Sequence, residues 1–312
     1  MPDTVVPNLL PPNGHGNPDA RLMRLATYAS VGVALVLIGV KFWAYLATES
    51  VSLLSTLIDS LLDAAASVVN MVAVHHALQP ADNEHRFGHG KAEALAGLAQ
   101  AAFISGSALF LVVEAGQRLI HPRALANTEI GVWVMGVSIV LTLVLVGFQR
   151  YVIRKTGSVA IGADSLHYEA DLLVNGSVIV SLLLVANLGW TLADPLFALA
   201  IAGYIVWGAW QIGIQSLNML MDRELPDEDR ERVRQITLAQ KGVLDVHDMK
   251  TRSSGSQVFI QLHVEMDGSQ SLRRSHDIAE RVMVAVEDAF PNAEVLVHQD
   301  PEGIDERREE FD

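Results

Sequence analysis

Six long apolar segments follow one another in the first 221 residues, separated by short polar stretches. A helix needs about 20 mostly apolar residues to cross the hydrocarbon core of a bilayer. The pattern therefore predicts a polytopic α-helical membrane protein with six transmembrane helices. The predicted spans are residues 25–47, 51–77, 92–119, 130–148, 158–188 and 195–221.

The hydrophobic period changes after residue 221. Two charged amphipathic segments predict helices and three alternating segments predict strands, in the order α-β-β-α-β. We expect the helices at residues 226–240 and 272–290, the strands at 243–252, 258–266 and 294–298, and a turn at 253–255. This order is typical of a small α+β domain in which helices cover one face of an antiparallel sheet.

The two patterns divide the chain into four parts. We expect a disordered N-terminal tail, a membrane domain, a soluble domain and a C-terminal tail, at residues 1–20, 21–221, 222–302 and 303–312. The first part lacks the positive segment and apolar stretch of a signal peptide.

Lys and Arg residues lie mostly on one side of the predicted membrane domain. If the N-terminus is inside, the inner side carries Arg21, Arg24, Arg86, Lys91, Arg150, Arg154 and Lys155, and the outer side carries Arg118 and Arg123. Because positive residues concentrate on the cytoplasmic side, both termini and the soluble domain are expected in the cytoplasm.

The composition narrows the possible chemistry. The chain has no cysteine, which excludes disulfides, thiolate metal sites and thiol catalysis. A metal site must then use His, Asp, Glu or other oxygen ligands. The net charge of −14, much of it in the soluble domain, argues against nucleic acid as a partner.

Two predicted spans carry charged residues in pairs. Asp59 and Asp63 lie four residues apart in the second span, and His167 and Asp171 lie four apart in the fifth. A charge near the bilayer centre costs about 2.5–3.5 kcal/mol, so two matched pairs need a reason. Four such ligands can close around one ion, and imidazole with carboxylates suits zinc, iron(II), cobalt or cadmium. The alternative is that each group caps a helix or forms an ion pair inside the membrane domain.

Other charged residues of the spans are weaker candidates. We expect Asp164, near the start of the fifth span, to be solvated or capping, and Glu169 to face away from His167. Glu114 and Lys41 are expected near membrane interfaces, where long side chains reach water.

Two further groups of possible ligands lie outside the spans. Asp82, His85 and His89 fall within one loop, where they form either a metal site or an ordinary polar loop; His75 and His76 before it are expected at the interface. The soluble domain could hold two ions that share a carboxylate, or it could simply carry surface histidines. Its candidate ligands are His247, His263, His276, His298 and Asp300.

Taken together, the motifs resemble the cation diffusion facilitator family, in its bacterial zinc and ferrous-iron efflux branch of the FieF (YiiP) type. The resemblance covers about residues 20–302. It is carried by Asp59-x3-Asp63, Gln79-Pro-Ala-Asp-Asn-Glu-His-Arg-Phe-Gly-His-Gly-Lys91, His167-x3-Asp171 and Val297-His298-Gln-Asp-Pro301.

The resemblance implies a homodimeric antiporter of divalent cations and protons in the bacterial inner membrane, with six helices and a cytoplasmic metallochaperone-like domain. It implies Zn²⁺ as substrate and as structural or regulatory ligand, with cadmium or iron(II) as other substrates, and no organic cofactor. The implied transport site is Asp59, Asp63, His167 and Asp171, and the loop site is Asp82, His85 and His89. The implied binuclear centre is His247, His263, His276, His298 and Asp300, and the implied charge interlock is Lys91 with Asp222.

The chemistry of the paired ligands favours proton-coupled transport. Carboxylates held together in a low dielectric bind protons when no cation is present, and an incoming metal displaces them. His167 is the natural group to exchange a proton, since an ordinary histidine has a pKa of about 6.5. The chain has no Walker A pattern for an ATP-driven pump and no H-E-x-x-H pattern for a metallohydrolase. A membrane-bound metal sensor that binds ions without moving them is the alternative.

Overall fold

The computed structural model describes residues 18–49, 51–120, 129–190 and 192–303. Within these ranges, six helices are long and apolar enough to cross a membrane, which confirms the six predicted spans. They are α1 (Pro18–Thr48), α2 (Val51–Ala77), α3 (Lys91–Ile120), α4 (Glu129–Thr156), α5 (Val159–Leu188) and α6 (Ala193–Leu220). The chain is therefore a multi-pass membrane protein.

The ends of the chain differ in one respect from the expectation. Helix α1 begins at Pro18, so the predicted disordered tail of residues 1–20 is wrong for its last three residues. Proline is a favoured first residue of a helix, because it lacks the N–H that would find no partner there. The rest of that tail and residues 304–312 of the predicted C-terminal tail lie outside the described residues.

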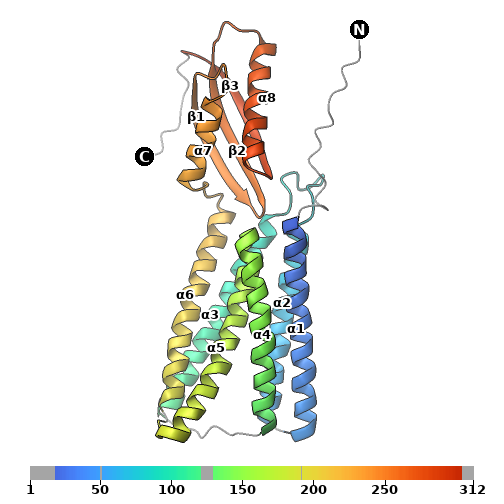
Figure 1. Cartoon of the computed structure of the whole chain (residues 1–312), viewed down its shortest axis with the longest axis vertical. Helices are drawn as coiled ribbons and strands as arrows, with labels where there is room; N and C mark the ends of the chain where they lie inside the picture. The colour runs from blue at the N-terminus through green and yellow to red at the C-terminus, as the bar shows by residue number, and fades with distance from the viewer. Residues whose placement is uncertain (1–17, 50, 121–128, 191, 304–312) are drawn as a thin grey trace. The chain divides into compact units, whose positions relative to one another are not determined.

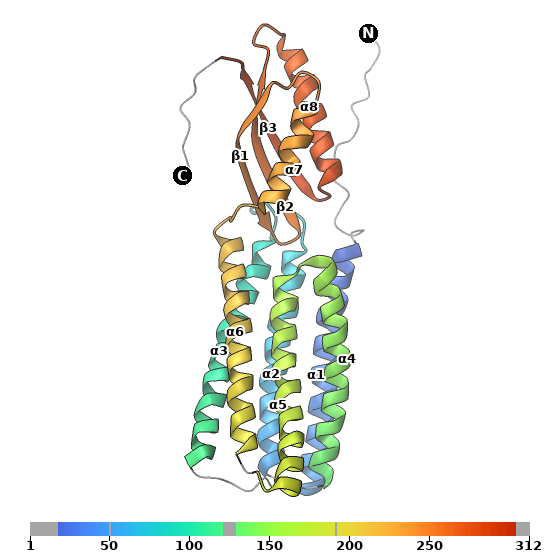
Figure 2. The ribbon, with the colours of Figure 1, turned by 60° about the vertical axis from the view of Figure 1, so that its left-hand side comes forward.

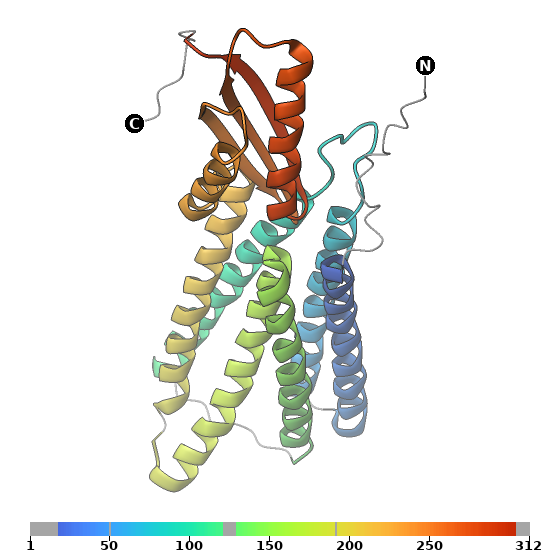
Figure 3. The same ribbon diagram turned by 45° about the horizontal axis from the view of Figure 1, so that its top comes forward.

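Two of the buried apolar groups of the membrane helices show how many helices contact α5. One group joins α5 to α1, α2, α3 and α4 and includes Met23, Val74 and Val152. The other joins α3, α5 and α6 through Ile104, Leu166 and Ile205. Figure 2 shows α3 and α6 beside each other with α5 next to them, and Figure 3 shows α1 beside α2. Helix α5 thus lies centrally in the membrane domain.

The start of α5 is fixed by its local sequence. Gly157 adopts the left-handed conformation (φ 64°), which lets the chain leave α4 in a single residue. The Ser158 side chain then accepts a hydrogen bond from the backbone N–H of Ile161 (3.2 Å) as an N-cap. Buried Glu93 of α3 also accepts from the N–H of Ala160 at 3.5 Å. These contacts fix where α5 begins.

The C-terminal domain has the predicted element order. It contains α7 (Asp227–Leu238), β1 (Asp245–Ser254), β2 (Gln257–Met266), α8 (Leu272–Ala289) and β3 (Ala293–Pro301), as Figure 1 shows. The sheet order is β1-β2-β3. The chain divides into two compact units at residues 216 and 217, a few residues before the expected domain boundary.

The sheet of this domain is mixed, and the prediction of an antiparallel sheet is wrong for one of its two pairs. Strands β1 and β2 are antiparallel, whereas β2 and β3 are parallel. Helix α8 carries the chain back along the sheet between β2 and β3, and such a crossover returns the next strand in the same direction. The β1–β2 turn is formed by Gly255 and Ser256 and begins two residues later than expected.

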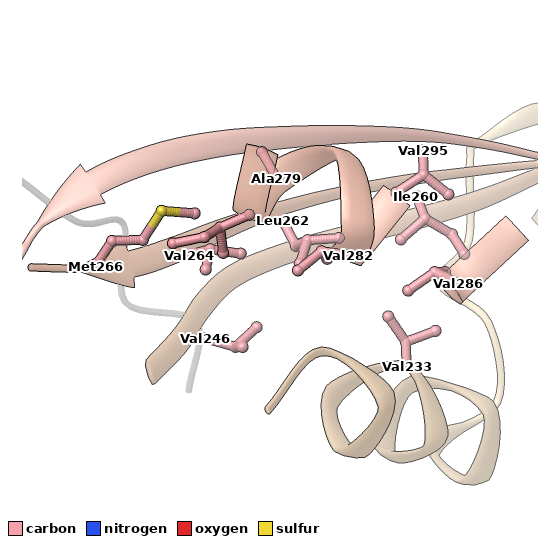
Figure 4. Packing of buried hydrophobic residues seen from close by; sticks show 11 residues of the cluster. Val233, Val246, Ile260, Leu262, Val264, Met266, Ala279, Val282, Val286 and Val295 are labelled. Carbon is pink, nitrogen blue, oxygen red and sulfur yellow. The ribbon is translucent and has the colours of Figure 1, made fainter. Parts of the chain in front are cut away.

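One face of the sheet packs against both helices. Figure 4 shows Val233 of α7 and Val286 of α8 pointing toward Ile260 of β2. Alternate residues of β2, including Leu262 and Val264, are buried in the same core. Because side chains alternate across a strand, the intervening His263 lies on the other face. The hydrophobic pattern of β2 therefore places the histidines opposite the core.

Candidate metal sites

Three of the four expected transport ligands converge between α2 and α5. Ligand atoms of Asp63, His167 and Asp171 lie within 4.8 Å of one another. His167 Nε2 lies 3.0 Å from Asp63 Oδ1 and 4.0 Å from Asp171 Oδ2. The His167 side chain is 8% exposed, so the imidazole is removed from solvent. Asp59, one turn away on α2, does not lie within this distance of all three groups.

Asp164 of α5 is fully buried, so the expectation that it is solvated or caps the helix is wrong. Its Oδ2 accepts hydrogen bonds from Ser30 Oγ (2.6 Å) and Gln149 Nε2 (2.7 Å), and its Oδ1 accepts one from Ser67 Oγ (3.3 Å). The donors come from α1, α4 and α2. Asp164 therefore ties four helices together one turn before His167.

The sequence prediction missed this network because its members belong to four separate helices. The hydroxyl of Tyr168 completes it, at 3.0 Å from Ser67 Oγ. The available signal was Ser67 as a polar residue within the second apolar segment and Gln149 directly after the fourth. Such residues in a membrane helix usually contact another helix rather than lipid.

Several other charged residues of the membrane helices have charged or polar partners. Glu169 faces away from His167, as expected, and its carboxylate accepts from Arg150 Nε and the Tyr204 hydroxyl, each at 2.9 Å. Further pairs are Arg118 with Glu114 (3.0 Å), Arg118 with Asp194 (2.8 Å) and Lys41 with Ser60 (2.6 Å). A polar partner lowers the free-energy cost of placing each of these charges in the membrane. Asp63, His167 and Asp171 differ from them because their ligand atoms converge on one point.

The loop after α2 gathers its three expected ligands. His85 Nδ1 and His89 Nε2 each lie 3.4 Å from a different oxygen of Asp82. Gly88 turns the chain with φ 77°. The hydrogen bond from the backbone N–H of His85 is the main cause that lowers the pKa of the Asp82 carboxyl, so this group stays ionised. His76 lies beside the group, with its ring centroid 4.5 Å from that of His89.

Four of the five expected ligands of the C-terminal domain meet around Asp300. Its Oδ2 lies 2.9 Å from His263 Nδ1 and 3.1 Å from His247 Nε2, and its Oδ1 lies 3.1 Å from His298 Nε2. The Asp300 side chain is 5% exposed. Oδ2 thus faces two imidazoles and Oδ1 faces a third, an arrangement suited to bridging two ions.

His276 is not part of this group. It lies on α8 with its side chain 63% exposed, and its Nε2 is 3.9 Å from Glu280 Oε1. The expected pairing of Lys91 with Asp222 would join the two compact units and stays a prediction. Within the C-terminal unit, Asp222 Oδ1 lies 3.4 Å from Arg252 Nη1.

Comparison with known proteins agrees with these features. Residues 27–221 match the model of the cation efflux transmembrane domain, and residues 225–302 match that of the cation efflux protein cytoplasmic domain. A cation-efflux pump FieF of Pectobacterium carotovorum is 48% identical over 282 residues, which cover 90% of this chain and 94% of the relative.

Two more relatives extend the comparison. A cation-efflux pump FieF of Yersinia enterocolitica is 46% identical over 285 residues, 91% of this chain and 95% of the relative. A solved structure of CzrB in its Zn form is 32% identical, covers 28% of this chain and 99% of its own, and has a TM-score of 0.25. The chain thus belongs to the cation diffusion facilitator family of cation-efflux proteins, in its FieF (YiiP) branch.

Proposed function

We propose that this protein exports divalent transition-metal cations, with zinc as substrate and cadmium or iron(II) as other substrates, in exchange for protons. The observation that carries the proposal is the convergence of Asp63, His167 and Asp171 inside two membrane helices. A ligand group at this depth serves an ion that crosses the membrane, since a surface domain suffices to sense one. The similar proteins are named cation-efflux pumps, which supports export as the direction of transport.

The donor set suits zinc and similar ions. One imidazole with carboxylate oxygens is a borderline environment, whereas calcium and magnesium prefer oxygen-only shells. Asp59 lies one turn along α2 from Asp63, and we propose it as the fourth ligand when the ion is bound. Four ligands of this type match the tetrahedral coordination that zinc adopts in proteins.

Proton coupling follows from the charge of the empty site. Carboxylates close together in a low dielectric cannot all stay ionised without a cation, so protons occupy the group until a metal displaces them. In an alternating-access cycle the group opens to one side at a time, exchanging metal for protons on the outside. The transporter is then driven by the proton gradient and uses no ATP.

The rest of the molecule fits a dimeric exporter of the bacterial inner membrane with both termini in the cytoplasm. The C-terminal domain matches the cytoplasmic-domain model of this family. We propose that its ligands around Asp300 bind zinc as a structural or regulatory ion. The loop ligands around Asp82 lie at the end of α2, where they could receive ions bound for the membrane site.

The direct test is uptake of zinc by proteoliposomes under an imposed pH gradient. Wild type should accumulate zinc and move protons the other way, and Asp63→Ala should lose at least about 90% of the initial rate. Glu49→Gln at the exposed end of α1 is a matched control that removes a carboxylate elsewhere. Binding of zinc without uptake would instead support a sensor, and unchanged uptake by Asp63→Ala would refute the proposal.

A further inference from the structure

We propose that the C-terminal domain holds a further divalent-cation position, formed by Asp245, His247 and Glu265 beside the group around Asp300. Neither Asp245 nor Glu265 belongs to the motifs described above. The proposal rests on the proposed metal-transport function, because it takes the same cations as its ligands. It adds a second cation position that uses His247.

Strand pairing brings the three residues together. Asp245 and His247 lie two residues apart on β1 and so share one face of the sheet. Glu265 is the direct cross-strand partner of Asp245. Ligand atoms of all three residues lie within 4.8 Å of one another, and His247 Nδ1 is 3.7 Å from Glu265 Oε1. The backbone register, rather than a flexible loop, therefore sets this group.

The imidazole of His247 supplies the second, independent observation. Its side chain is 9% exposed, and its Nδ1 is buried without a hydrogen-bond partner among the residues that the structure describes. The separation of 3.7 Å from Glu265 is too long for a hydrogen bond. A buried polar atom left unsatisfied costs about 1–3 kcal/mol. A cation bound between this nitrogen and the two carboxylates would remove that cost.

The two nitrogens of His247 face different groups. Nε2 lies 3.1 Å from Asp300 Oδ2, and Nδ1 points toward Glu265. A neutral imidazole has one nitrogen that can bind a cation, and the other carries the proton. The new position and the Asp300 group therefore compete for His247. An ion bound through Nδ1 leaves His263 and His298 to the Asp300 group.

The chemistry of the new position differs from that of the Asp300 group. It has two carboxylates and one imidazole, whereas Asp300 is surrounded by three imidazoles. A site richer in oxygen accepts harder ions such as manganese or iron(II) alongside zinc. The Asp245 side chain is 51% exposed, so ions can reach the position from solvent.

The neighbouring Arg234 opposes binding. Arg234 Nη2 lies 3.9 Å from Asp245 Oδ1, with both side chains about half exposed. Exposed pairs of this kind are weak, so the arginine lowers the affinity of the position without closing it. Replacing Arg234 should therefore strengthen cation binding, whereas replacing one of the proposed ligands should weaken it.

The test measures zinc bound per full-length chain by equilibrium dialysis and metal analysis. Asp63→Ala and His89→Ala first remove binding at the membrane and loop positions, and Asp300→Ala then disables the remaining centre. If Asp300→Ala does not fold by circular dichroism, His263→Ala with His298→Ala replaces it. On this background one zinc ion should still bind.

The decisive variants change only the proposed ligands and their neighbour. Glu265→Gln and Asp245→Asn should each weaken the remaining binding at least 10-fold, and Arg234→Gln should tighten it about 2- to 5-fold. Glu294→Gln, an exposed carboxylate on β3, is the matched control and should change nothing.

Two outcomes would overturn the proposal. In one, Glu265→Gln and Asp245→Asn leave binding unchanged. In the other, Glu265→Gln weakens binding only while Asp300 is intact, which would make Glu265 a residue that orients His247. Uptake by the otherwise wild-type chain in proteoliposomes separates either outcome from a failure of the proposed function, since that function requires uptake whatever Glu265 does.

Discussion

Asp164 offers the sharpest test of how the membrane helices are held around the metal ligands. The substitution Asp164→Ala removes the acceptor of three hydrogen bonds, from Ser30, Ser67 and Gln149. A hydrogen bond between membrane helices contributes on average about 0.6 and at most about 1.7 kcal/mol. Three of them together give about 2–5 kcal/mol. We expect Asp164→Ala to lower the free energy of unfolding by that amount.

Reversible unfolding in mixed micelles, followed by circular dichroism, measures this loss. Ser177→Ala is a matched control on the same helix, because Ser177 Oγ donates only to Val174 O of its own helix and should cost little. A double-mutant cycle with Gln149→Ala isolates the contact between α4 and α5. If Asp164→Ala is no less stable than Ser177→Ala, or if the cycle shows no coupling, the network does not hold the helices and the reasoning fails.

Two further predictions use other features of the membrane domain and its loop. Gly208→Ala would place a Cβ 2.8 Å from the two terminal methyl carbons of Leu166. Because Leu166 is buried and has little room to move, we expect this overpacking to cost about 1–3 kcal/mol in the same unfolding assay. A Cβ at Gly203 of the same helix would have no atom within 4 Å, so Gly203→Ala should not destabilise the protein, and equal stabilities would contradict the α5–α6 packing. The folded loop lowers the pKa of the Asp82 carboxyl, so the ionised carboxylate stabilises the folded loop. This stabilisation is fully present above the ordinary aspartate pKa of about 3.9, and it is lost as the pH falls through the lower pKa of the folded loop. The chemical shift of the His85 amide, followed by NMR, should titrate with a midpoint below the ordinary aspartate pKa, and a midpoint at or above it would disprove the hydrogen bond.

The six membrane helices were predictable because apolar length alone decides whether a segment can span a bilayer. Helix α2 has the predicted bounds, and α5 begins within one residue of the prediction. The spacing of His167 and Asp171 also predicted that both face the same way. These properties depend on a single helix, so they can be derived from a periodic pattern.

Properties that depend on two or more elements were predicted less well. The burial of Asp164 depends on partners on three other helices, and the direction of β3 depends on the path of α8. The distance of Asp59 from the other ligands depends on the axial position of α2 against α5, which spacing along one helix does not determine. The separation of His276 from Asp300 has the same cause, since one lies on a helix and the other on a strand.

The two-residue junction at Gly157 and Ser158 has a mechanical consequence. Because α4 ends at Thr156 and α5 begins at Val159, α5 cannot slide along its axis without displacing α4. Any movement that exposes His167 to the opposite side of the membrane must then carry α4 and α5 as one hairpin. The chain contains no native cysteine, so pairs of spin labels can be attached to these helices without removing a residue first. Distances within the hairpin should stay constant while distances from the hairpin to α3 change with zinc.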